Sequence, residues 1–442
     1  MPILPPRLGF KMMSNAPTFF RDFATNKTLD HGFGPNITFT RTGTATYFDS
    51  NGTLITATAN TPRFDHDPVT LASRGLLIEE GRTNSIANSQ GTGAVAGTAG
   101  TAPTGWSISG NANGLTRTIA TGSINGFSYI DVTTSGTTTS SNIGIVFDPQ
   151  SSTAGYTAST GQTWAGSVYL ALVNGSFPGY RAIRVSERNS SNTLIANTDV
   201  QLTGITSSLQ RFTATRTLNN ADTAKVTFDI RVENIPISTA VNFTLRIAAP
   251  QLEQGAFATS YIPTTSAAVT RGADSAVVTP ISSFYNASEG TLFFENVYTT
   301  AVYNSASNYW GNPMRFYRND PPNNRPYIEF YTQIRSTGAT LGQSIKLVSS
   351  DNTIQAEVGF ASAITAASTN KYAAGYATND VATFRNGTAG NVDTGVNLTG
   401  FEAINSLSIG IGTGGNYING HIRKVGYWPR RLSNANLQAM TA

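Results

Sequence analysis

The chain has 442 residues, a length that favours two or three domains. Only 12% of the residues are charged, and the net charge of +4 is spread without a basic cluster, which argues against nucleic-acid binding. With 39% hydrophobic residues, 23 Phe and 17 Tyr among them, the chain can build real cores, so disorder of the whole chain is not expected.

Several classes of structure are excluded by what the sequence lacks. The chain has no cysteine, so disulfides, thiolate metal sites and cysteine nucleophiles are excluded. It has no apolar run of 18 residues, so we expect no membrane insertion, and Met1–Arg7 lacks the apolar core of a signal peptide. Strong helix formers never gather at a period of 3.6 residues over four turns, so we expect extended structure with many turns.

Residues 1–35 carry two proline-rich patches around an aromatic patch that contains Phe19, Phe20 and Phe23. Proline favours extended backbone outside sheets. Two interpretations stay open. The segment is either a loosely packed tail or an attachment arm whose exposed aromatic side chains anchor it to a neighbouring protein.

Residues 36–85 are denser, and they hold three ordered motifs. A strand ends in the turn Asp49–Gly52, and the motifs are Thr44–Gly52, Pro62–Asp65 and Gly75–Asn84. This series resembles a segment that recurs in tail, fibre and other minor structural proteins of bacteriophages. The resemblance covers about a tenth of the chain. It implies membership of a phage particle and no particular chemistry.

Residues 86–262 show turn-separated strands from Trp106 onward. In one of them Val226, Phe228 and Ile230 alternate with Lys225, Thr227 and Asp229, so the first three should point inward and the others outward. About eight such strands favour a jelly-roll sandwich. The end of this unit, residues 250–265, resembles the last strand and exit of carbohydrate-binding-module-like jelly rolls in phage proteins.

Residues 286–442 predict a second sandwich after a linker of small residues at 264–285. The closing strand at 420–428 leads to Ser433, a good N-cap for a terminal helical turn. This ending resembles concanavalin/laminin-G-type sandwiches on phage fibre proteins, although residues 301–345 depart from that pattern and suggest an inserted loop system. We therefore predict an all-β chain with an attachment region at 1–85, a jelly roll at 86–263 and a concanavalin-like sandwich at 286–442.

The sequence shows no clear catalytic or metal-binding motif. The three histidines, His31, His66 and His421, lie in different segments, and no Gly-x-Ser-x-Gly elbow occurs. Asp65 and Asp67 flank His66, but neighbours in an extended chain point in opposite directions, so capping carboxylates in a turn are expected there. No cofactor and no metal site are predicted, although the resemblance to both sandwich families allows a structural calcium ion.

The carboxylates show no spacing that pairs them across a sugar, as a glycosidase requires. Glu79 and Glu80 are sequence neighbours, and we expect Glu79 to fix Arg82 or a backbone turn. The long β-helix repeat of polysaccharide depolymerases is absent. We therefore expect a protein that is not an enzyme.

Sugar binding needs aromatic faces for the pyranose ring and short polar side chains for its hydroxyls. Two regions have that composition. The first contains Trp106, Asn111 and Asn113, and the second contains Tyr309, Trp310, Asn312, Arg315, Tyr317 and Tyr327. The alternative is that these aromatic residues pack in the sandwich cores, as we expect for Trp164 and Trp428.

The resemblance implies a non-enzymatic structural protein of a phage virion, as a fibre, tail-tip or head-decoration protein made in the host cytoplasm. Its partners would be other virion proteins, two further copies in a homotrimer, and glycans of the host surface. Several copies on one particle would raise avidity by roughly 100- to 10,000-fold. Two alternatives stay open: a tail-spike enzyme that degrades polysaccharide, and a purely architectural protein without a ligand.

Overall fold

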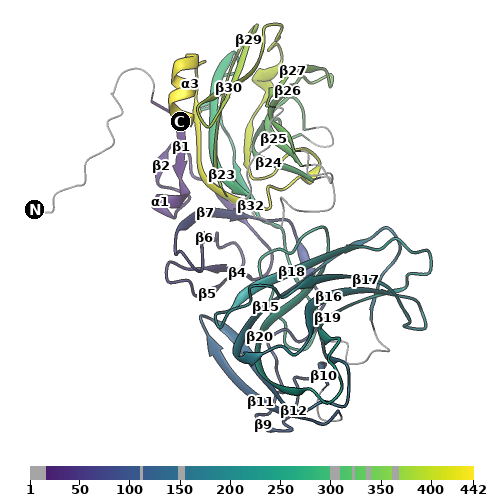
Figure 1. Ribbon diagram of the computed structural model, residues 1–442. Helices are drawn as coiled ribbons and strands as arrows, with labels where there is room; N and C mark the ends of the chain where they lie inside the picture. The colour runs from purple at the N-terminus through teal and green to yellow at the C-terminus, as the bar shows by residue number, and fades with distance from the viewer. Residues whose placement is uncertain are drawn as a thin grey trace, which may run out of the picture.

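The computed structural model describes residues 16–109, 113–147, 155–298, 309–320, 324–334, 340–360 and 368–442. Nearly all of its regular structure is β, and the predicted all-β architecture is confirmed. Figure 1 shows two β-sandwiches end to end, with β4 (Ala45–Phe48), β5 (Leu54–Ala57), β6 (Phe64–His66) and β7 (Ser73–Ile78) where they meet. Among the described residues, no helix is long and apolar enough to cross a membrane.

The first sandwich, for which the sequence predicts a jelly roll, consists of two six-stranded sheets. One sheet has the order β10 (Ser107–Ile108), β13 (Ile143–Val146), β19 (Lys225–Glu233), β16 (Tyr180–Arg188) and β17 (Leu194–Gln201), with β14 (Tyr156–Thr157) also on β19. The other has the order β18 (Gln210–Thr217), β15 (Thr163–Ser176), β20 (Ala240–Gln254), β12 (Phe127–Thr137), β11 (Leu115–Ile124) and β9 (Gly97–Thr98). Their facing side chains form one apolar core.

Strand β19 shows how far the alternation predicts burial. Val226, Phe228 and Ile230 lie in the core, as predicted. Asp229 was predicted to face water, yet it is fully buried. It is covered by the guanidinium of Arg231, whose Nε lies 2.9 Å from its Oδ1, and burial raises the pKa of this carboxyl. A side chain on the outer face of a strand is therefore not always exposed to solvent.

The second sandwich also has two sheets. The nine-stranded sheet has the order β2 (Gly32–Phe33), β1 (Phe19–Asp22), β32 (Gly420–Trp428), β23 (Glu289–Tyr298), β28 (Thr369–Ala377), β29 (Asp380–Arg385) and β30 (Thr388–Asp393), with β7 on β32 and β6 on β7. The seven-stranded sheet has the order β27 (Ile354–Gly359), β26 (Thr340–Val348), β25 (Tyr327–Ile334), β24 (Tyr309–Tyr317), β31 (Ser406–Ile409), β22 (Ser275–Val278) and β3 (Thr38–Thr40).

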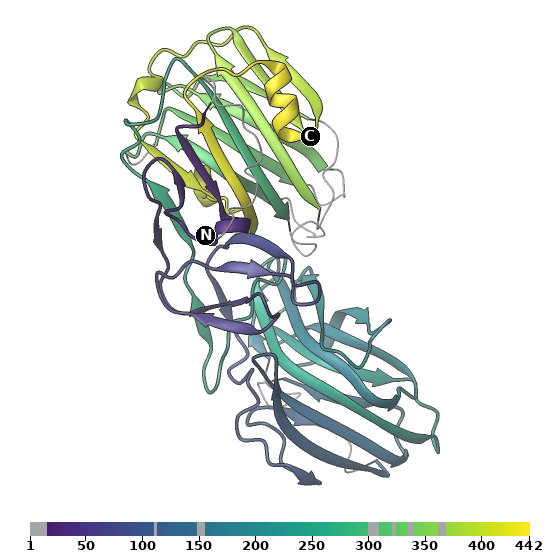
Figure 2. The same ribbon diagram turned by 90° about the vertical axis from the view of Figure 1, so that its left-hand side faces the viewer.

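β1, β2, β3, β6 and β7 are part of this second sandwich and not of a separate arm, whereas β4 and β5 form a two-stranded sheet of their own. β1 pairs antiparallel with β32, so that Phe19 lies opposite Tyr427, and β3 pairs with β22 in the other sheet. Figure 2 shows the purple N-terminal strand beside the yellow C-terminal strand. The side chains of Phe19 and Phe23 are fully buried in the core, and Phe20 is half-buried. Phe19 and Phe23 therefore cannot serve as exposed anchors in the folded chain.

The segment predicted as a linker, 264–285, also carries structure. β21 (Val269–Arg271) pairs with β8 (Arg82–Asn84), and β22 is inserted between β31 and β3. At the other end of the chain, Ser433 accepts a hydrogen bond from the Asn436 N–H at 3.3 Å and caps α3 (Asn434–Thr441), as predicted. The chain therefore enters the first sandwich through β8 and leaves it through β21, and these two strands pair with each other.

Candidate functional site

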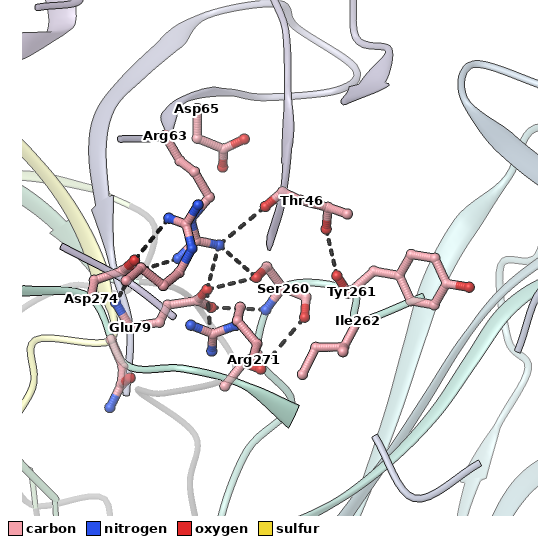
Figure 3. Close-up of polar contacts among 12 residues, drawn as sticks. Thr46, Arg63, Asp65, Glu79, Ser260, Tyr261, Ile262, Arg271 and Asp274 are labelled. Carbon is pink, nitrogen blue, oxygen red and sulfur yellow. Dashed lines mark hydrogen bonds and ion pairs between the residues drawn. The ribbon is translucent and has the colours of Figure 1, made fainter. Parts of the chain in front are cut away.

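A group of buried charges lies where the two sandwiches meet, and we call it the joint network (Figure 3). Arg63 is its centre. Its Nη1 lies 2.8 Å from Oε2 of Glu79, and its Nη2 lies 2.5 Å from Oδ2 of Asp274. Arg41 approaches the other oxygen of Asp274 at 3.1 Å, and Arg271 approaches Glu79 at 3.6 Å. All five side chains are at most 7% exposed, so these ion pairs are shielded from water.

The joint network fixes the exit of the jelly roll to the N-terminal segment. Ser260 donates its N–H to Oε1 of Glu79 at 2.8 Å and its hydroxyl to Oε2 at 2.6 Å. Thr46 donates its hydroxyl to the carbonyl of Tyr261 at 2.5 Å. Burial alone would raise the pKa of Glu79, but the charges of Arg271 and Arg63 and the hydrogen bonds from Ser260 hold it well below its usual value.

The last residue of the third motif completes this attachment. The Asn84 side chain donates to the carbonyls of Ile262 at 2.9 Å and Pro250 at 3.4 Å. Its oxygen accepts from the N–H groups of Ile86 and Leu252, each at 3.1 Å. The three ordered motifs between Thr44 and Asn84 therefore contribute Thr46, Arg63, Glu79 and Asn84 to one buried junction, in which their role is structural.

Two of the three histidines lie near this junction, although the sequence separates them widely. Nε2 of His421 on β32 lies 2.7 Å from Oδ2 of Asp65 on β6, and the N–H of Phe48 donates to the other oxygen at 2.7 Å. His66 contacts the carbonyl of Phe48 at 3.1 Å through Nδ1. Asp65 was predicted to be a capping carboxylate, and it does accept a backbone N–H, but it also orients His421.

A cavity of about 400 Å³ opens beside the His421–Asp65 pair, and we call it the junction pocket. Both sandwiches and the N-terminal segment contribute to its wall. Aromatic rings come from Phe48, Tyr169 and Tyr261, while Arg74, Gln210 and Arg211 supply hydrogen-bonding groups. Small-molecule sites are usually lined by apolar and aromatic side chains together with a few polar groups.

A second hollow, of about 730 Å³, is more open and more polar. It lies between the β8–β21 ribbon and the start of β15, and Arg82, Trp164 and Gln254 are part of its wall. Trp164 is only 6% exposed and belongs to the jelly-roll core, as predicted. Little of its ring is therefore open to this hollow.

The first predicted sugar-binding region is not exposed in the structure. Trp106 is 3% exposed, packs edge-on against Phe147 with ring centroids 4.9 Å apart, and donates its indole N–H to the carbonyl of Asn88 at 2.8 Å. Asn111 lies outside the described residues, and Asn113 is half-buried. Because Trp106 is buried in the core and its indole N–H is already bonded, this indole cannot stack on a sugar.

The second predicted region lies on β24 and β25, and Arg315 is its centre. The guanidinium of Arg315 lies 4.8 Å from the ring centroid of Tyr317 and 4.8 Å from that of Tyr327. Cation–π contacts therefore occupy one face of each tyrosine. Asn312 is buried and donates to the carbonyl of Phe330 at 3.2 Å. The side chains of Tyr309 and Trp310 lie outside the described residues.

Several acidic residues are engaged in structural contacts. Glu253 on β20 is buried and accepts from Thr259, and Glu329 on β25 accepts from Thr413, so the two lie in different sandwiches. Burial raises the pKa of each carboxyl. Arg82 was expected to hold Glu79, but it pairs with Glu80 instead. Among the described residues, no group of three or more His, Asp or Glu side chains could hold a metal ion.

Sequence reasoning missed the residues of the junction pocket. Tyr169 and Arg211 come from neighbouring jelly-roll strands, Arg74 from β7 and His421 from β32. No spacing rule connects positions so far apart. The sequence did single out two residues of the pocket wall, Asp65 and Glu79, but it assigned them local roles, because only the fold supplies their distant partners.

No protein-family model and no curated protein matches this chain. Among solved structures, the CBM40 module of the Ruminococcus gnavus IT-sialidase has a TM-score of 0.28 and 16% identity, over 36% of this chain and 84% of that one. The tandem CBM22 modules of Paenibacillus barcinonensis Xyn10C have a TM-score of 0.25 and 11% identity, over 78% of this chain and 96% of that one. The Trypanosoma rangeli sialidase has a TM-score of 0.25 and 8% identity, over 74% of this chain and 66% of that one. These likenesses are too distant to transfer a ligand or an activity.

Proposed function

We propose that this chain is a non-catalytic structural protein of a bacteriophage particle and that it binds carbohydrate in the junction pocket. The observation that carries the binding proposal is the wall of that pocket, which sets Phe48, Tyr169 and Tyr261 beside side-chain donors and acceptors. The partly exposed ring of Phe48 suits the apolar face of a pyranose, and the polar groups of the wall suit its hydroxyls. The pocket lies where all three parts of the chain meet, so it requires the complete fold.

The proposal of a phage particle rests on the resemblance of the three ordered motifs. Their residues Arg63, Glu79 and Asn84 are buried in the junction, so the resemblance concerns a way of joining two sandwiches. A protein of this kind would sit on the virion as a fibre, tail-tip or head-decoration protein. Its partners would be other virion proteins, further copies of itself in a trimer, and glycans of the host surface.

The test is a glycan array with the full chain, followed by titration calorimetry on the best ligand. Val69 lines the junction pocket and is 84% exposed, so Val69→Trp should obstruct the pocket without disturbing the core. Val95→Trp, at another exposed valine outside the pocket wall, is the matched control. We expect millimolar binding, about −4 kcal/mol, that Val69→Trp abolishes and Val95→Trp retains.

A purely architectural role is the second candidate, and the joint network favours it. Five buried charged side chains that fix two sandwiches to each other are what a cement or spacer protein needs. Absence of binding to every glycan on the array by a folded preparation would establish this role in place of adhesion. Release of shortened polysaccharide by a homogeneous preparation would instead establish the tail-spike enzyme.

A further inference from the structure

We propose that the junction pocket selects sugars that carry a carboxylate, and that Arg211 is the residue that pairs with it. This inference rests on the proposed carbohydrate binding and adds the chemical class of the ligand. Arg211 belongs to β18 of the jelly roll and lines the pocket. Uronic acids and sialic acids share the carboxylate, and the experiment below distinguishes them.

Arg211 lacks a balancing charge. No described carboxylate lies within 4.0 Å of its guanidinium, whereas the other arginine of the pocket wall, Arg74, pairs with Asp67 at 2.6 Å. Nη2 of Arg211 donates to the Ser167 hydroxyl at 2.9 Å and to the Thr259 carbonyl at 2.7 Å. No described residue accepts a hydrogen bond from its Nε or Nη1. Two neutral contacts therefore hold the guanidinium in place while its charge remains available.

Tyr169 lies beside this guanidinium and offers a second group of the right kind. Its ring centroid is 5.6 Å from the Arg211 guanidinium carbon, and no described residue forms a hydrogen bond with its hydroxyl. Burial raises the pKa of this phenol, so the hydroxyl stays protonated at neutral pH and can donate. A guanidinium and a phenol on the wall of one pocket are a suitable pair for the two oxygens of a carboxylate.

The acidic groups of the pocket do not cancel the charge of Arg211, because each already has partners. Asp65 accepts from the Phe48 N–H and contacts His421, both at 2.7 Å. Glu79 is paired with Arg63 at 2.8 Å. A neutral sugar would leave Arg211 without a counter-charge, whereas a carboxylate would supply one in a site partly removed from water.

The experiment compares three ligands by calorimetry with the full chain: a galacturonate oligosaccharide, sialyllactose and neutral lactose. Arg211→Gln removes the charge and keeps a side chain that can contact Ser167, and Tyr169→Phe removes only the hydroxyl. Arg246→Gln is the matched control, because Arg246 lies outside the pocket wall and its charge is balanced by Asp131 at 2.8 Å. Far-UV spectra and melting curves verify that each variant is folded.

We expect one acidic sugar to bind at least about tenfold more tightly than lactose, and Arg211→Gln to remove that preference. Tyr169→Phe should weaken the acidic ligand alone, and Arg246→Gln should weaken neither. Whichever acidic sugar binds identifies the source of the carboxylate. Equal binding of acidic and neutral sugars, unchanged in Arg211→Gln, would overturn this inference and leave carbohydrate binding intact. Absence of all binding would overturn the proposed function itself.

Discussion

At the scale of single residues, Glu79 connects the joint network to the exit of the jelly roll through Ser260. It accepts hydrogen bonds from Ser260 and pairs with Arg63 and Arg271, and it is 6% exposed. The joint network contains three arginines and two carboxylates, so it already carries one excess positive charge. Loss of either carboxylate would leave two uncompensated guanidinium charges away from water, which is costly.

We predict that Glu79→Gln lowers the free energy of unfolding at pH 7 by about 3–5 kcal/mol, as breaking a buried ion pair does. The pKa of Glu79 is lowered in the folded chain. Its contribution is therefore complete above its unfolded pKa of about 4.3 and is lost as the pH falls toward the folded value. Urea unfolding between pH 6 and pH 3 should show a shallower decline for Glu79→Gln than for the unmodified protein.

Asp320→Asn is the control for this prediction, because Asp320 forms an ion pair with Arg318 in which both side chains are about half exposed. Its removal should cost less than about 1 kcal/mol. The pKa of Asp67 is also lowered, to about 2, so some acid sensitivity should remain in Glu79→Gln. Equal costs for the two variants at pH 7 would show that the joint network does not stabilise the fold.

The partners of Glu79 could not be predicted from the sequence. The motif placed Glu79 three residues before Arg82, and the shorter separation was the obvious pairing. In the structure, Arg82 bonds to Glu80 and the Gln254 carbonyl, while Glu79 pairs with residues 16 and 192 positions away. Local spacing predicted the turn at Asp49–Gly52, since its hydrogen bonds are local, but charges in an all-β fold pair through topology.

At the scale of elements, β32 could be predicted from its local sequence, whereas β1 could not. The alternation and the Ser433 cap were sufficient to predict β32 and α3. Prolines upstream and the short length of the aromatic patch favoured an arm over a strand at Phe19–Asp22. The structure places β1 on β32 because Phe19 fits a pocket of aromatic side chains, where it stacks on Phe284 at 5.2 Å. A four-residue strand carries too little periodicity to be recognised without its partner.

We predict that Phe19→Ala destabilises the C-terminal sandwich by about 3–5 kcal/mol, because it removes a fully buried ring from a packed core. Phe33→Ala is the matched control: Phe33 lies on the neighbouring strand β2 and is 55% exposed, so it should change stability by less than about 0.5 kcal/mol. Thermal unfolding followed by tryptophan fluorescence measures both. A small, equal effect of the two variants would restore the interpretation of residues 19–23 as a free arm.

At the scale of the whole molecule, strand pairing and buried ion pairs connect the two sandwiches in addition to the chain itself. β8 pairs with β21, and the Asn84 side chain bonds to the carbonyl of Ile262. The joint network adds buried ion pairs to these contacts. An attachment with several strands and buried ion pairs should hold one mutual orientation, whereas a single flexible linker would not. A rigid junction also keeps the junction pocket in one shape, which lowers the entropic cost of binding.

We predict that the unmodified chain scatters X-rays in solution as one rigid particle and that Arg63→Ala broadens its distance distribution. Removal of Arg63 leaves Glu79 and Asp274 with weaker partners at 3.6 Å and 3.1 Å, so water must enter the junction to solvate them. Arg184→Ala is the control, because Arg184 pairs with Asp199 and Glu233 on the face of one jelly-roll sheet. It should change local stability and leave the distance distribution as it was. A distribution unchanged by Arg63→Ala in a protein that remains folded would show that the strand pairs, and not the buried charges, set the orientation of the sandwiches.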